Sequence, residues 1–226
     1  TCRVFVEARS IMSTNELCHQ YTQEGLREED VDPNPIRQFT SWFELAQAVH
    51  TDEWFMPHAM TLATCGADGI PAARVVLLKT FDDNGFVFYT NYVSQKAQQF
   101  ETNPSAALVF YWPMLQRQVR ITGPVTKISI QESEAYHRTR PRGSQLGALV
   151  SNQSEVIPNR DVLERKMVEL DELYRDRDVP LPENWGGYRV AAHAIEFWQG
   201  RPNRLHDRLL YTRQSNSSWT IQRLAP

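Results

Sequence analysis

The sequence predicts a mainly β protein of the α+β class, in which antiparallel strands form one barrel with flanking helices. Between residues 58 and 128, apolar stretches are separated by short breaks that pair Gly with Asp or Asn, the residues that tolerate hairpin turns. One small helical pattern interrupts these stretches, whereas alternating βαβ units would need a helix after each strand. No internal repeat divides the 226 residues, so the last strands are expected to complete the same barrel.

The composition is that of an ordinary globular protein. Hydrophobic residues make up 41% and charged residues 23%, which excludes the disordered and fibrous classes. The net charge of −3 argues against nucleic-acid binding, and no apolar run approaches the ~20 residues that span a bilayer. Three cysteines without a CxxC pair and six histidines without HExxH spacing indicate neither a disulfide framework nor a metal site. A cytoplasmic protein is therefore expected.

The first 31 residues are predicted to be a mobile arm that precedes a single domain over residues 32–226. Residues 1–11 contain only a three-residue apolar run, too short for a secretory signal, and two interpretations stay open for them: an upstream extension or a poorly conserved leader. Residues 12–31 are polar and charged, with few apolar anchors. A helix then begins with Asp32 as its cap and Pro33 in its first turn, followed by apolar residues at helical spacing.

Each later element follows from its local pattern. The first barrel strands are expected over 58–65, 71–79, 86–90, 105–112 and 115–128, with a short helix from Ser94 to about residue 103. Two helices are expected over 131–140 and 159–175, the first of which Pro141 ends. The last strands are expected over 188–190, 194–199, 208–212 and 219–223.

Cations and hydroxyls beside strand ends form the first candidate site. Arg74 and Lys79 bracket an apolar strand, and Tyr136 and Arg140 are four residues apart on a predicted helix just before Ser144. Converging hydroxyls and guanidinium groups suit a phosphate dianion. Taken alone, each pattern is equally that of a solvated surface. The chain has neither a GxGxxG nor a GxxxxGK[ST] segment, so no Rossmann or P-loop site is indicated.

A second group of cations follows the strand predicted over 194–199. Arg201, Arg204, His206 and Arg208 surround a single acid, Asp207, and cations this close repel one another unless an anion binds. Neutral hydrogen-bonding groups and one aromatic side chain could hold a flat heteroaromatic ring, although each is also compatible with an ordinary core or surface position. These residues are Trp198, Gln118, Gln153 and Ser154.

A series of short segments matches one known family in order along the chain. They are ARVVLLK (73–79), FYTN (88–91), NP-x-AALVFYW (103–112), RQVR-x-x-G (117–123), RPRGSQ-x-GA (140–148), QS (153–154), WGG (185–187), EFWQGR (196–201), RLHDR (204–208) and RLAP (223–226). With these segments, the chain resembles the pyridoxine (pyridoxamine) 5′-phosphate oxidase family from about residue 21 to residue 226. So many ordered matches make chance similarity improbable.

The resemblance implies a homodimer of FMN-binding split β-barrels with antiparallel Greek-key strands and FMN at the subunit interface. It implies oxidation of pyridoxine 5′-phosphate or pyridoxamine 5′-phosphate to pyridoxal 5′-phosphate, with O2 reduced to H2O2. Arg204 and His206 would be the catalytic residues beside the substrate ring. The residues implied to contact FMN are Arg74, Val75, Val76, Leu77, Tyr89, Thr90, Gln95, Lys96, Gln118, Gln153, Ser154, Trp198 and Arg208. Those implied to contact the substrate are Tyr21, Lys79, Tyr136, Arg140, Ser144, Arg204, Leu205 and His206.

Two positions depart from the family pattern. Gln95 stands where the family usually has Arg, and Cys18 stands where some members have an Arg near the equivalent of Tyr21. Two other functions remain open: an FMN oxidase of phenazine-type rings on the same fold, and a non-catalytic flavin- or PLP-binding protein. An unphosphorylated ring would leave the cations around Arg140 unpaired, which favours the phosphorylated substrate.

Overall fold

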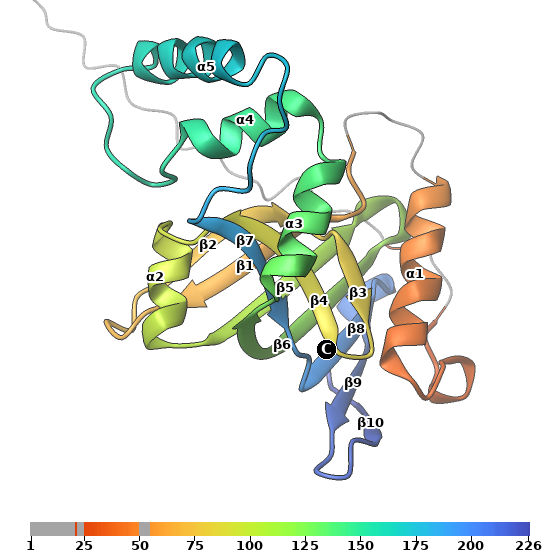
Figure 1. The fold of residues 1–226 in the computed structure, drawn as a ribbon. Helices are drawn as coiled ribbons and strands as arrows, with labels where there is room; N and C mark the ends of the chain where they lie inside the picture. The colour runs from red at the N-terminus through yellow and green to blue at the C-terminus, as the bar shows by residue number, and fades with distance from the viewer. Residues whose placement is uncertain (1–20, 22–24, 50–54) are drawn as a thin grey trace, which may run out of the picture.

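A computed structural model describes residues 21, 25–49 and 55–226, and its strands form one curled antiparallel sheet (Figure 1). The strands are β1 (Ala59–Cys65), β2 (Pro71–Leu77), β3 (Thr80–Asp82), β4 (Gly85–Asn91), β5 (Ser105–Trp112), β6 (Arg117–Lys127), β7 (Trp185–Val190), β8 (Ala194–Gln199), β9 (Asp207–Arg213) and β10 (Trp219–Arg223). The helices are α1 (Pro35–Val49), α2 (Gln95–Thr102), α3 (Ile130–Thr139), α4 (Arg142–Val150) and α5 (Asp161–Leu173). Short 3-10 helices cover Glu28–Asp30, Pro113–Leu115 and Pro202–Arg204.

The long strand β6 joins the two halves of the sheet. Most of its length pairs with β5 and β8, in the strand order β10-β9-β8-β6-β5-β1-β2. Its last residues, from Val125 to Lys127, instead pair with β7, which continues to β4 and β3. A strand that takes part in both halves curls the sheet into an open barrel. The predicted mainly β, split-barrel fold is confirmed.

The core of the barrel is aromatic and is closed by α1. Phe39 is fully buried, with ring centroids 5.0 Å from Phe86 and 5.1 Å from Phe110, and Trp42 lies 5.2 Å from Phe197. These α1 side chains are three residues apart, so they share the helix face that covers the sheet. The other helices lie elsewhere: α3 packs beside β7, and α4 and α5 lie together beyond one end of the barrel (Figure 1).

Several element boundaries differ from those expected. The first helix begins two residues later than expected, because the side chain of Asn34, not that of Asp32, accepts the N–H groups of Ile36 and Arg37. Asp32 instead accepts the N–H of Asn34 at 2.7 Å and so fixes the approach to the helix. Two elements, β3 and α4, have no clear signal in the sequence, since β3 has only three residues and the first turn of α4 contains Gly143.

Part of the segment assigned to a mobile arm is packed against the barrel. Leu26 is only 6% exposed, and its N–H donates to the carboxylate of Asp207 at 3.0 Å. Packed structure therefore begins before residue 32. The remainder of the arm, with Cys2 and Cys18, lies outside the described residues.

Within the described part of the chain, no helix is long and apolar enough to cross a membrane. The same residues contain no cluster of three or more His, Cys, Asp or Glu that could hold a metal ion.

Candidate active site

A cleft of about 640 Å³ opens between β2, β4 and the helices α2, α3 and α4. Many of the residues expected to hold ligands line it, from both the FMN and the substrate groups. They are Arg74, Val75, Val76, Leu77, Lys79, Tyr89, Thr90, Lys96, Tyr136, Arg140, Ser144 and Gln153. Gln95 and Ser154 line an adjoining hollow to which Gln153 also contributes.

Lys96 brings a buried cation to one end of this cleft. It is 6% exposed in the first turn of α2, and its Nζ donates to Thr90 Oγ1 (3.0 Å), Ser94 Oγ (3.1 Å) and Gln153 Oε1 (2.7 Å). Burial, followed by the charge of Arg74, lowers the pKa of Lys96 to about 8. All three partners are neutral, so a bound phosphate would supply the negative charge that none of them provides to this ammonium group.

Arg74 projects from β2 and is oriented by the neighbouring strand β1. Its Nη1 donates to Thr64 Oγ1 at 2.5 Å and to the carbonyl oxygen of Leu62 at 3.3 Å. Burial lowers the pKa of the guanidinium, which nevertheless stays charged at neutral pH. Together with Lys96 and the N-terminus of α2, Arg74 makes this end of the cleft suitable for an anion.

Arg140 provides a second cationic position on the same cleft. Its guanidinium carbon lies 4.6 Å from the centre of the Trp185 ring, and its buried Nη1 has no hydrogen-bond partner among the described residues. Tyr136 stacks on Tyr89 with a centroid separation of 4.0 Å, and Tyr89 stacks on Trp185 at 5.3 Å. A buried guanidinium N–H without a partner is costly, so the arrangement fits an anionic ligand that accepts it.

A further group of predicted site residues does not line this cleft. Gln118, Trp198 and Arg208 are directly opposite one another on β6, β8 and β9, so their side chains share one face of the sheet. Arg208 is fixed there because Glu196, which is 7% exposed, accepts its Nε at 2.8 Å and also pairs with Arg120 at 3.1 Å.

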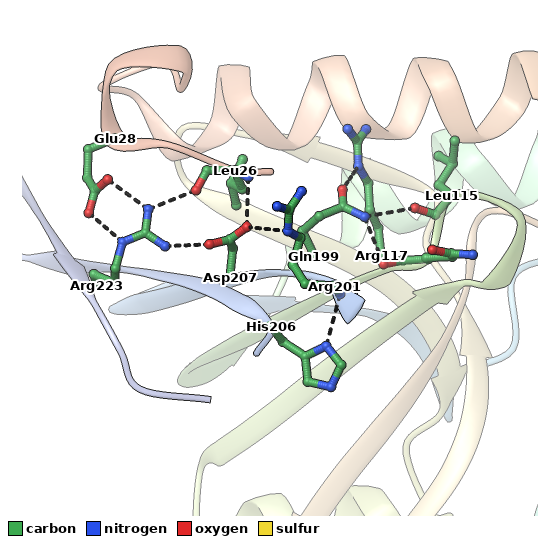
Figure 2. A network of polar contacts seen from close by, with 10 residues as sticks. Leu26, Glu28, Leu115, Arg117, Gln199, Arg201, His206, Asp207 and Arg223 are labelled. Atoms are coloured by element: carbon green, nitrogen blue, oxygen red, sulfur yellow. Dashed lines mark hydrogen bonds and ion pairs between the residues drawn. The ribbon is translucent and has the colours of Figure 1, made fainter. Parts of the chain in front are cut away.

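Three rings gather beside this row. The centroid of His206 lies 4.7 Å from that of Trp198, and Tyr21 contacts both rings edge-on, at 5.1 Å from His206 and 5.6 Å from Trp198. The Nδ1 of His206 accepts the backbone N–H of Arg201 at 3.1 Å, so the proton of the neutral imidazole resides on Nε2 (Figure 2). Burial and then the charge of Arg204 lower the pKa of His206, which favours this neutral form.

The loop before His206 has an unusual backbone. Asn203 and Arg204 both have positive φ angles, 58° and 62°, although neither is glycine. Such residues cost roughly 1–3 kcal/mol each and are concentrated at functional sites. Arg204 and Leu205 are exposed, so this loop presents its side chains to solvent in the isolated chain.

The comparison with known proteins decides the family. Residues 48–174 match the family described as pyridoxamine 5′-phosphate oxidase. This chain belongs to that family. Residues 185–226 match the pyridoxine 5′-phosphate oxidase C-terminal dimerisation region, which begins at β7 and includes Trp198, His206 and Arg208.

Relatives named pyridoxine/pyridoxamine 5′-phosphate oxidase cover nearly the whole chain. The protein from Nostoc sp. (strain PCC 7120) is 56% identical over 211 residues, which are 93% of this chain and 97% of the relative. The protein from Rubrobacter xylanophilus is 54% identical over 93% of this chain and 95% of the relative.

Solved structures show the same fold. PhzG from Burkholderia lata 383, in complex with tetrahydrophenazine-1-carboxylic acid, has a TM-score of 0.84 at 28% identity, and the match covers 92% of this chain and all of PhzG. A pyridoxamine 5′-phosphate oxidase-related, FMN binding protein from Nostoc punctiforme has a TM-score of 0.67 at 19% identity, over 85% of this chain and 98% of that protein.

The structure adds residues for which the sequence analysis had no role. Trp185 belongs to the WGG motif at residues 185–187, but only the fold places its ring against Arg140 and Tyr89. Glu196 belongs to the EFWQGR motif at residues 196–201, which by itself indicates no role for this carboxylate. In the structure it pairs with Arg208 at 2.8 Å. Tyr111 is opposite Gln118 on β5 and continues the same cross-strand row, with 53% of its surface exposed.

Proposed function

We propose that this protein is an FMN-dependent oxidase of pyridoxine 5′-phosphate and pyridoxamine 5′-phosphate, with pyridoxal 5′-phosphate and H2O2 as products. The observation that carries the proposal is the pair of cationic positions on one cleft, around Lys96 and around Arg140. A flavin mononucleotide and a phosphorylated substrate each bring one phosphate, so two separate positions match the two ligands. The names of the relatives support the same reaction.

In this proposal, FMN binds at the Lys96 end of the cleft. When bound, FMN accepts two electrons from the 4′ carbon of the substrate and passes them to O2. Lys96 and Arg74 hold its phosphate, while Gln95 and Ser154 lie at the rim near the start of α2. The other residues proposed to contact FMN are Val75, Val76, Leu77, Tyr89, Thr90, Gln118, Gln153, Trp198 and Arg208.

The substrate is proposed to bind by its phosphate at the opposite end. Arg140 supplies a buried donor that lacks a partner among the described residues, and Lys79, Tyr136 and Ser144 line the same cleft. Holding the phosphate far from the reacting carbon orients that carbon without taking part in the chemistry. Tyr21, Arg204, Leu205 and His206 are proposed to contact the rest of the substrate.

A homodimer would bring the two groups of site residues together. Within one chain, the row of Gln118, Trp198 and Arg208 does not line the cleft that contains Lys96 and Arg140. The row lies mainly in the region that matches the dimerisation family. We therefore propose that one protomer supplies the cleft and its partner supplies the row, with FMN between them.

His206 is proposed to act as a hydrogen-bond donor to the substrate. Its Nδ1 already accepts the N–H of Arg201, so the neutral ring has only Nε2–H to offer. Arg204 adds a positive charge beside it, which disfavours the imidazolium and keeps His206 in the neutral form that donates from Nε2.

One assay tests the proposal. Purified protein loaded with FMN is mixed with pyridoxine 5′-phosphate in air, and H2O2 and the aldehyde absorbance of the product are recorded. Both should appear in equal amounts. Bound FMN with neither product would contradict the oxidase function and favour a non-catalytic flavin- or PLP-binding protein.

A phenazine-type substrate is the second candidate because of the fold shared with PhzG. A substrate of that type without a phosphate would leave Arg140 Nη1 unpaired in the cleft. Competition distinguishes the two: inorganic phosphate should inhibit turnover of pyridoxine 5′-phosphate by occupying the Arg140 position. A faster reaction with a reduced phenazine carboxylate than with pyridoxine 5′-phosphate would reverse the assignment.

A further inference from the structure

A chain of charged contacts joins three segments that are distant in the sequence (Figure 2). Arg223, on β10, donates to both carboxylate oxygens of Glu28 (2.8 and 2.7 Å) and to the backbone carbonyl of Leu26 (2.8 Å). Its Nη1 donates to Asp207 Oδ1 at 2.7 Å. One guanidinium thus connects the N-terminal segment to the start of β9.

Asp207 extends these contacts in two directions. Its Oδ2 accepts the backbone N–H of Leu26 at 3.0 Å and pairs with Arg201 Nε at 3.5 Å. Arg201 in turn donates its backbone N–H to His206, the residue just before Asp207. Asp207 therefore holds the N-terminal segment with one hydrogen bond and the His206 loop with an ion pair.

Both connected segments carry groups proposed to face the substrate. Tyr21 precedes Leu26 and contacts the His206 ring. Gly200, at the start of the loop, is so close to the Tyr21 ring that a Cβ there would lie 2.3 Å from Tyr21 Cδ1. Arg204 occupies the middle of the loop, with the left-handed backbone described above. A strained loop persists only where its surroundings determine its conformation, and Arg201 and Asp207 close it at both ends.

We propose that Arg223 and Asp207 form a latch that positions Tyr21, Arg204 and His206 as one unit over the substrate ring. The inference rests on the proposed function for its substrate, and the latch itself is a property of the chain. Neither residue touches the cleft that contains Lys96 and Arg140, so both are positioning residues. Arg208, next to Asp207, is held by Glu196 and by the carbonyl oxygen of Ala225, and neither contact involves the Arg223 side chain, so loss of the latch should spare FMN.

The test uses the FMN-loaded protein and the variants Arg223→Ala, Arg223→Lys and Glu28→Ala. Arg160→Ala is the matched control, because it removes another exposed ion pair, Arg160–Glu164, on α5. Hydrogen exchange is measured for peptides covering residues 25–30 and 200–207. KM and kcat for pyridoxine 5′-phosphate and the Kd of FMN are measured in parallel.

If Arg223 and Asp207 form a latch, Arg223→Ala should speed hydrogen exchange in both peptides by about tenfold, because the same contacts hold both segments in place. KM should rise about fivefold, with smaller changes in kcat and in the Kd of FMN, because a partly exposed ion pair is lost and the cleft is untouched. Arg223→Lys should recover part of the effect, Glu28→Ala should speed both peptides to a smaller extent, and Arg160→Ala should resemble the unmodified protein.

Faster exchange in residues 25–30 alone, in either Arg223→Ala or Glu28→Ala, would overturn the latch, because it would show that the two segments move independently. Unchanged KM with faster exchange in both peptides would overturn the positioning role. If the unmodified protein produces no H2O2, the proposed function fails, and the two exchange rates still decide whether the segments are coupled.

Discussion

The ammonium of Lys96 lies 2.7 Å from the side-chain oxygen of Gln153, a residue 57 positions later in the chain. The contact brings the first turn of α2 against the segment that follows α4 and buries a cation among neutral groups. A cation in this setting is held ready for a phosphate and has a lowered pKa.

The affinity for FMN should fall as the pH rises through about 8. In the free protein, Lys96 loses its proton near this pH, because burial and the charge of Arg74 lower its pKa to about 8 from the ordinary lysine value. Bound phosphate favours the protonated form, so binding above this pH requires uptake of a proton and weakens by up to about tenfold per pH unit. Titration of the apoprotein with FMN between pH 6.5 and 9.5 checks this. Lys96→Arg should abolish this change of affinity with pH, because arginine keeps its charge over the whole range. An FMN affinity that does not change with pH in the unmodified protein would contradict a phosphate role for Lys96.

Gln95→Arg should tighten FMN about three- to tenfold and steepen the salt dependence of binding. Residue 95 is exposed at the first position of α2, where an added cation would reach a phosphate from a rim open to water, so the gain should be nearer ~1 than ~3 kcal/mol. FMN titration at low and high salt measures it. Lys96→Ala is the control and should weaken FMN by more than Gln95→Arg strengthens it. Unchanged affinity at low salt would show that position 95 points away from the phosphate.

Arg140→Ala should raise KM for pyridoxine 5′-phosphate about thirtyfold, equivalent to loss of a charge-assisted contact of about 2 kcal/mol. Its unpartnered Nη1 faces the end of the cleft opposite to Lys96 in this proposal, so the Kd of FMN should hardly change. Steady-state kinetics and FMN titration of the same preparation separate the two effects. Equal losses for both ligands would mean that Arg140 holds the phosphate of FMN.

An isolated protomer should bind FMN poorly. The row of Gln118, Trp198 and Arg208 does not line the cleft of its own chain, so a lone protomer would offer FMN only part of its contacts. Sedimentation with detection at the flavin absorbance, over a dilution series, should show FMN released as the dimer dissociates. A monomer that carries stoichiometric FMN would refute the shared site.

Much of this protein could be predicted from local patterns. Hairpin breaks rich in Gly, Asp and Asn have backbone preferences that act over a few residues, so the strands around β1, β2, β4 and β5 could be located to within about two residues of their ends. The start of the first helix was misplaced by two residues because Asp32 and Asn34 are both good caps, and only packing selects between them. Family motifs identified the candidate cations one by one.

Other features depend on contacts between distant segments and were decided by the tertiary structure. The ring of Trp185 meets Arg140 only because β7 pairs with β4 beside α3, and Arg223 meets Glu28 only because the last strand lies against the N-terminal segment. These two contacts join residues 45 and 195 positions apart in the chain. Local spacing cannot predict them, because they depend on how the whole sheet curls. The sequence by itself determined most of the strands, the fold class and the residue types of the site. Tertiary packing decided which of these residues share a cleft, which lie on a separate face, and which hold the others in place.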